Sequence, residues 1–128
     1  MATEGFGTKW TFTADADLST KQFYFGSYTG ASKIDIVTTS GTPKVAGVIQ
    51  NKASANKGVD VMLWGISKVF AASNLTAGDI VGATASGTAQ IITSGTGGSA
   101  YHAKGQVLRG SSASGFATVV LAATPWLS

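Results

Sequence analysis

Three short apolar runs in the middle of the chain constrain its fold more than any other feature. They are Val45–Ile49, Val59–Leu63 and Ile66–Phe70, separated by polar, glycine-bearing turns or by the pair Trp64-Gly65. Runs of this length and composition are typical of strands that have one face, or nearly both faces, in a core. The segment Leu75–Val81 then predicts a tight turn leading into another strand. The middle of the chain therefore predicts part of a small β-barrel.

Length and composition point to a single β-rich domain. A chain of 128 residues can bury one core of modest size. It contains 17 glycines and only 12% charged residues, and it has few of the leucines, glutamates, lysines and arginines that favour long helices. Low charge combined with many alanine, glycine, serine and threonine residues also indicates a surface that is covered in an assembly, because soluble monomers usually carry more charge.

Further short strands are expected on both sides of the central runs. The sequence predicts them at Lys21–Gly26, Lys33–Thr38, Asp79–Thr84, Thr88–Thr93, Tyr101–Arg109 and Phe116–Ala122. A single helical turn is predicted at Ala71–Leu75. The expected core comprises Val61, Leu63, Ile66, Val69, Ile80, Val107, Val119 and Leu121. The predicted fold class is all-β, a small β-barrel or β-tulip-like domain with an extended N-terminal arm.

The first 20 residues have a different pattern from the rest, and we expect residues 1–20 to form the arm and residues 21–128 the barrel-like domain. The arm would expose the aromatic residues Phe6, Trp10 and Phe12, and exposed apolar groups of this kind usually have a partner. A second interpretation makes Trp10–Thr13 the first strand of the barrel. Near the other end, Trp126 must pack on the barrel or on a neighbour. These four aromatic residues are the candidate partner contacts.

The sequence offers no constellation suited to catalysis or metal binding. His102 is the only histidine and there is no cysteine, so neither a cluster of imidazoles nor a thiolate site can form. Asp15 and Asp17 are better explained as turn-capping residues than as cation ligands. The glycine-rich segment Gly95–Gly98 lacks the lysine and hydroxyl residue of a phosphate-binding loop. We therefore predict no catalytic residue, no metal and no cofactor, and an enzyme is the least favoured class.

Charge and hydropathy exclude several kinds of partner. The net charge is +3, and the nine basic residues are scattered singly rather than grouped in a run that follows phosphates. No apolar run reaches the length needed to span a membrane. The N-terminal residues do not resemble a secretory signal. We expect a protein made in a reducing cytoplasm that binds neither nucleic acid nor membrane.

Several segments taken in order resemble the small capsid cement proteins of tailed phages, also called head decoration proteins. The segments that carry the resemblance are Val48–Lys52, Gly58–Val61, Gly65–Val69, Leu75–Val81, Ala103–Leu108 and Val119–Leu121. The likeness rests on their order and spacing from about Val45 to Ala122. It departs from the family at Lys52-Ala53, where the family often has proline, and the first 40 residues do not align.

The resemblance implies a structural protein without enzymatic activity. Cement proteins of this family bind the outer surface of a mature phage head, usually as trimers at or near threefold axes, and clamp adjacent major capsid subunits together. A virion location on the outer capsid surface, the major capsid protein as partner, and a homotrimer on the capsid are the corresponding expectations. The alternative is a carbohydrate- or host-surface-binding β module displayed on a virion, which exposed aromatic residues and loops rich in serine and threonine would suit.

Overall fold

The computed structural model describes residues 7–38, 45–92 and 105–121, and these residues fold as nine β-strands of one sheet. The strands are β1 Gly7–Ala14, β2 Phe25–Gly30, β3 Lys33–Ile36, β4 Val45–Ile49, β5 Gly58–Phe70, β6 Ile80–Ala83, β7 Ala89–Ile91, β8 Gly105–Arg109 and β9 Phe116–Leu121. The described part of the chain has no helix, and hence none that could cross a membrane. The predicted all-β class is confirmed.

The first five strands close into a small barrel. They neighbour one another in the order β1-β3-β2-β4-β5, and β1 also pairs with β5, which completes the circle. The β1–β3 pair is parallel and the other pairs are antiparallel. Buried side chains of these strands form one hydrophobic cluster with Leu18 and Ala53 from the connecting segments; the strand members are Phe12, Ala14, Ile34, Ala46, Ile49, Val59 and Val61.

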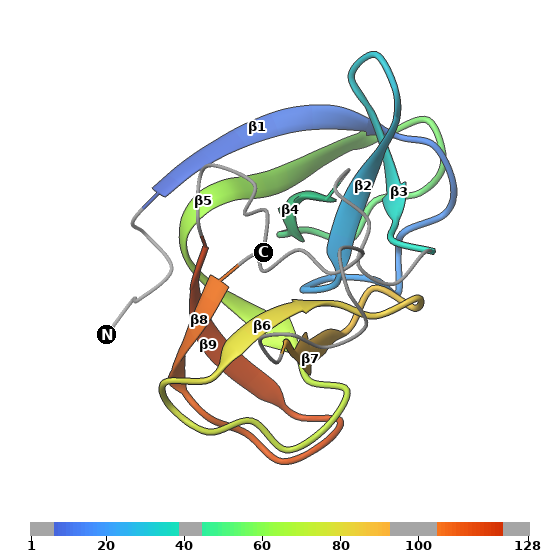
Figure 1. Ribbon diagram of the computed structural model, residues 1–128. Coiled ribbons are helices and arrows are strands. Elements are labelled where there is room, and N and C mark those ends of the chain that lie inside the picture. Colours follow the sequence, from blue (N-terminus) through green and yellow to red (C-terminus); the bar gives the residue numbers. More distant parts are fainter. Residues whose placement is uncertain (1–6, 39–44, 93–104, 122–128) are drawn as a thin grey trace.

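Strand β5 connects this barrel to the remaining strands. Figure 1 shows it curving from beneath β1 down to β6, β7 and β9 in the lower half of the molecule. The two apolar runs that the sequence separates at Trp64-Gly65 are thus halves of one 13-residue strand. Gly65 has a φ of 124°, a conformation that glycine adopts far more readily than other residues, so the chain can bend there without ending the strand.

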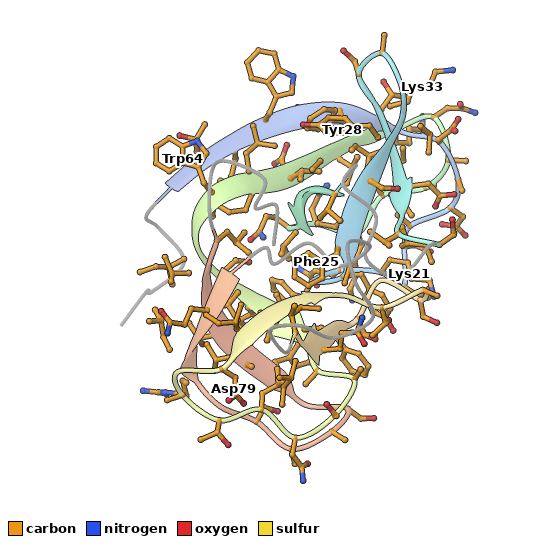
Figure 2. The ribbon with its side chains drawn as sticks, viewed as in Figure 1. Lys21, Phe25, Tyr28, Lys33, Trp64 and Asp79 are labelled. Carbon is orange, nitrogen blue, oxygen red and sulfur yellow. The ribbon has the colours of Figure 1, made fainter. Side chains whose placement is uncertain are left out.

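The second half of β5 starts a further group of strands in the order β5-β9-β8-β6-β7. A bridge between Ala71 and Ala89 links β7 back to the end of β5. A second hydrophobic cluster lies in this group and also takes in Phe25 and Met62 from the barrel strands. Phe25 lies near the centre of the molecule in Figure 2. Most of the predicted core is found in one or other cluster, namely Val61, Val69, Val107, Val119 and Leu121.

Three predicted core residues are placed differently. Leu63 and Ile66 are half-buried, and Ile80 is 40% exposed. Ile80 pairs with Gln106, which is also exposed, so its side chain lies on the outward face of β6 and β8. The sequence places an apolar residue at the strand start but does not say which face of the sheet that residue occupies.

Residues 7–20 do not form a free arm. This finding corrects the prediction that residues 1–20 form an extended arm. Strand β1 pairs with β5 from Gly7 to Thr13, and Phe12, Ala14 and Leu18 are buried in the barrel cluster. The structure therefore agrees with the second interpretation of Trp10–Thr13, in which these residues belong to the first strand of the barrel. Residues 1–6 lie outside the described part of the chain.

Two further local predictions are corrected. The strand expected at Lys21–Gly26 begins only at Phe25 and continues past Gly26 to Gly30. Phe23 has a φ of 70°, which is incompatible with an extended strand. The helical turn expected at Ala71–Leu75 is absent, because Ala71 and Leu75 instead form single bridges to Ala89 and Ser111.

Candidate interaction surfaces

The described residues contain no arrangement suited to acid–base or metal chemistry. No three histidine, cysteine, aspartate or glutamate side chains come together among them, and His102 lies outside them. The exposed Asp17 accepts a hydrogen bond from the backbone N–H of Ser19 at 3.0 Å. Hydrogen bonds from the Ser19 side chain and backbone hold the pKa of the Asp17 carboxyl below its usual value. This carboxylate therefore fixes a turn, as the sequence suggests.

Exposed aromatic side chains gather along β1 and its neighbours. Trp10 is 60% exposed, and Trp64 and Tyr28 are also exposed. The β1–β5 register places Thr8 opposite Trp64 and Trp10 opposite Val61, with a register shift between Thr8 and Lys9, so both tryptophans belong to this strand pair close to its irregularity. In Figure 2, Trp64 projects at the side of the molecule where β1 begins. We call Trp10, Tyr28 and Trp64 the β1 aromatic surface.

Of the four sequence-predicted contact residues, the structure describes Trp10 and Phe12, and the exposure of these two differs. Trp10 is available to a partner, whereas Phe12 is only 7% exposed and packs edge-on against Tyr28, with ring centroids 5.9 Å apart. Phe12 therefore anchors the β1 aromatic surface from inside rather than touching a partner. Phe6 and Trp126 lie outside the described residues. Trp64, which sequence analysis names only in the pair that separates two apolar runs, is an exposed aromatic residue that it did not propose as a contact.

A second apolar surface lies on the outward side of β9, β8 and β6. Val120 pairs with Gln106, and Gln106 pairs with Ile80, so these three side chains form a row across the strands. Leu108, two residues beyond Gln106, is exposed as well. The outward side of an antiparallel sheet is usually polar, so exposed apolar residues in register suggest a covered surface. We call Ile80, Leu108 and Val120 the β9 face.

A third feature is an open depression of about 440 Å³ next to the end of β5. We call it the aromatic depression, and its lining comprises Ser19, Thr20, Gln22, Phe23, Tyr24, Lys52, Phe70 and Phe116. Its volume falls within the range of ligand pockets, roughly 300–1,000 Å³. Sequence analysis missed this site because its residues come from four separate segments, and the aromatic run at Phe23–Phe25 was assigned to a strand.

The rings of the aromatic depression hold one another in place. Phe116 meets Phe23 and Phe70 edge-to-face, with centroids 5.5 Å apart in both pairs. Phe70 in turn stacks on Tyr24 at 5.4 Å, with planes 6° apart. The arrangement begins with the β5–β9 register, which places Phe70 opposite Phe116. Such ring contacts add stability beyond the buried area alone.

Comparison with known proteins gives a likeness in structure but none in sequence. No protein family model and no curated protein sequence match this chain. Its fold is similar to the crystal structure of the N base of the head fiber gp8.5 of bacteriophage phi29, with a TM-score of 0.66 and 15% sequence identity. The alignment covers 93% of this chain and 97% of that one. At this identity the likeness concerns the fold, which the two chains share over nearly their full lengths.

Proposed function

We propose that this protein is a structural component of a phage head. On this proposal it binds the outside of the mature capsid as a cement protein, clamps adjacent major capsid subunits, and catalyses no reaction. The observation that carries the proposal is the similarity of the whole fold to the base of a head fiber. The order of segments from Val45 to Ala122 that resembles cement proteins supports it independently.

The β1 aromatic surface is the proposed capsid contact. Exposed tryptophans are over-represented among the residues that dominate binding energy at protein interfaces. Here Trp10 is held on a strand paired with β5 on one side and β3 on the other, so little conformational freedom is lost when it docks. Phe6 and Trp126 remain proposed contacts as well. The β9 face would then serve contacts between copies in a homotrimer.

Binding to purified heads tests the proposal. Expanded heads of the phage that encodes this chain, prepared without it, are titrated with the protein, and we expect saturable binding. Trp10→Ala should weaken binding by about 30-fold, which corresponds to an interface hot spot of about 2 kcal/mol. The matched control is Ile91→Ala, an exposed apolar residue on β7, away from β1 in Figure 1, which should bind as the unmodified protein does.

Three results would each contradict one part of the proposal. Equal saturation by the Trp10→Ala and unmodified proteins would remove the β1 aromatic surface from the contact. A failure of the unmodified protein to bind expanded heads, or to raise the temperature at which they rupture, would exclude the cement function. Particle density with single copies away from every threefold or quasi-threefold axis would contradict the trimer.

A further inference from the structure

The aromatic depression carries an inference that does not depend on the proposed function. We infer that it is a binding site for an acidic saccharide, a sugar unit that bears a carboxylate. It is separate from the β1 aromatic surface, since its residues come from the segment around Phe23, Lys52 between β4 and β5, the end of β5 and the start of β9.

One part of the lining is apolar and fixed. Phe116 is 53% exposed, yet its ring is held edge-on by both Phe23 and Phe70. The face of an aromatic ring is electron-rich and attracts the slightly positive C–H groups that cover one side of a sugar ring. A rigid, exposed ring of this kind is a platform on which a sugar can stack without first ordering the protein.

The backbone at Phe23 is held in an unusual conformation. A bulky residue with a φ of 70° is a genuine outlier and is tolerated only where its surroundings impose it. Here the Phe23 N–H donates to the Ile49 carbonyl at 2.7 Å, and the Phe70 N–H donates to the Phe23 carbonyl at 3.0 Å. Strain of this type is found at ligand sites, and Phe23 is one of the residues that line the depression.

The other part of the lining is polar and carries positive charge. Ser19 and Thr20 bring hydroxyl groups, and Gln22 is fixed by a hydrogen bond from its Nε2 to the Gln50 carbonyl at 2.9 Å. Hydroxyl and amide groups beside an aromatic wall match a sugar, which has an apolar side and a polar rim. This combination distinguishes a saccharide from an apolar protein side chain as the occupant.

Charge complementarity selects an acidic saccharide. Lys52 lines the depression, and the described lining contains no carboxylate. Two further ammonium groups lie over its rings: Lys21 Nζ is 5.0 Å from the centre of Tyr24, and Lys68 Nζ is 5.8 Å from the centre of Phe23. Asp17, two residues before Ser19, is turned onto the Ser19 N–H and is not part of the lining. A carboxylate on the sugar would therefore meet the Lys52 ammonium group, and no carboxylate of the described lining would oppose it.

The test compares two tetrasaccharides that differ only in charge, β-1,4-linked glucuronate and its neutral counterpart cellotetraose. They are titrated into the isotope-labelled full chain while backbone amide shifts are followed. We expect shifts at Phe23, Phe70 and Phe116, with the glucuronate binding about tenfold more tightly at low salt and losing that advantage at high salt. Because no heads are present, the result stands apart from the test of the cement function.

Three variants test whether the saccharides bind in the aromatic depression. Phe116→Ala should abolish binding of both sugars, whereas Lys52→Gln should remove most of the preference for the acidic one. Ile91→Ala, an exposed apolar residue outside the depression, is the matched control and should bind as the unmodified chain does. Equal binding of both sugars, no binding at millimolar concentration, or an unchanged preference in Lys52→Gln would overturn the proposal. So would a change of oligomeric mass in Phe116→Ala, which would identify the depression as a contact between copies.

Discussion

Leu121 and Ile80 show how far the burial of a single side chain can be predicted from the sequence. Both are apolar strand residues expected in the core, but Leu121 is buried and Ile80 is 40% exposed. Leu121→Ala removes buried methyl groups and should lower the free energy of unfolding by about 2–5 kcal/mol. Ile80→Ala, its matched control, should change it by no more than about 0.5 kcal/mol. Denaturant titration measures both, and equal losses would mean that the faces of β6 and β9 are wrongly assigned.

The sequence also could not predict which of the candidate contact residues are exposed. Trp10 and Phe12 alternate with threonines and look equivalent in the sequence, yet one is exposed and the other packs in the barrel. They lie on the same side of β1, but Phe12 faces Val59 inside the barrel, while Trp10 lies closer to the end where the register shifts between Thr8 and Lys9. Register and bulges depend on the partner strand, so the pattern of one strand cannot predict them.

At the scale of elements, short apolar runs located most strands, and the errors lie where backbone geometry overrides composition. The aromatic run at Lys21–Gly26 has high strand propensity, but the left-handed conformation of Phe23 delays β2. Trp64-Gly65 looks like a break, but the ladders with β1 and β9 hold β5 continuous through it. Gly47 is required for a different reason, because a side chain there would collide with the Met62 carbonyl on β5.

Strand β1 provides the test of the N-terminal assignment. A chain beginning at Asp15 lacks β1, which opens the barrel, unpairs one edge of β5 and removes Phe12 and Ala14 from the core. We expect it to lose the cooperative unfolding transition seen by circular dichroism. A chain beginning at Gly7 retains every described strand and should keep that transition. If the shorter chain still folds, residues 7–14 are an arm after all, and their pairing with β5 adds little stability.

At the scale of the whole molecule, the two hydrophobic clusters should behave as one cooperative unit. Strand β5 supplies Val59 and Val61 to the barrel cluster and Met62 and Val69 to the other. Phe25 extends from the barrel into the second cluster, and its N–H donates to the Gly87 carbonyl in the β6–β7 turn at 2.7 Å. Neither group of strands can lose its packing without exposing apolar surface on the other, so no half-folded state should be populated.

Two substitutions, one in each cluster, test this cooperativity. Ile34→Ala in the barrel cluster and Val119→Ala in the second cluster each create a cavity at a fully buried site. We expect each to lower the stability of both halves equally, so that amide hydrogen exchange in β3 and β8 reports the same decrease in opening free energy. If Val119→Ala lowers protection in β8 and leaves β3 unchanged, the halves open separately. The shared strand would then join two independent units, and a partner could bind one of them while the other unfolds.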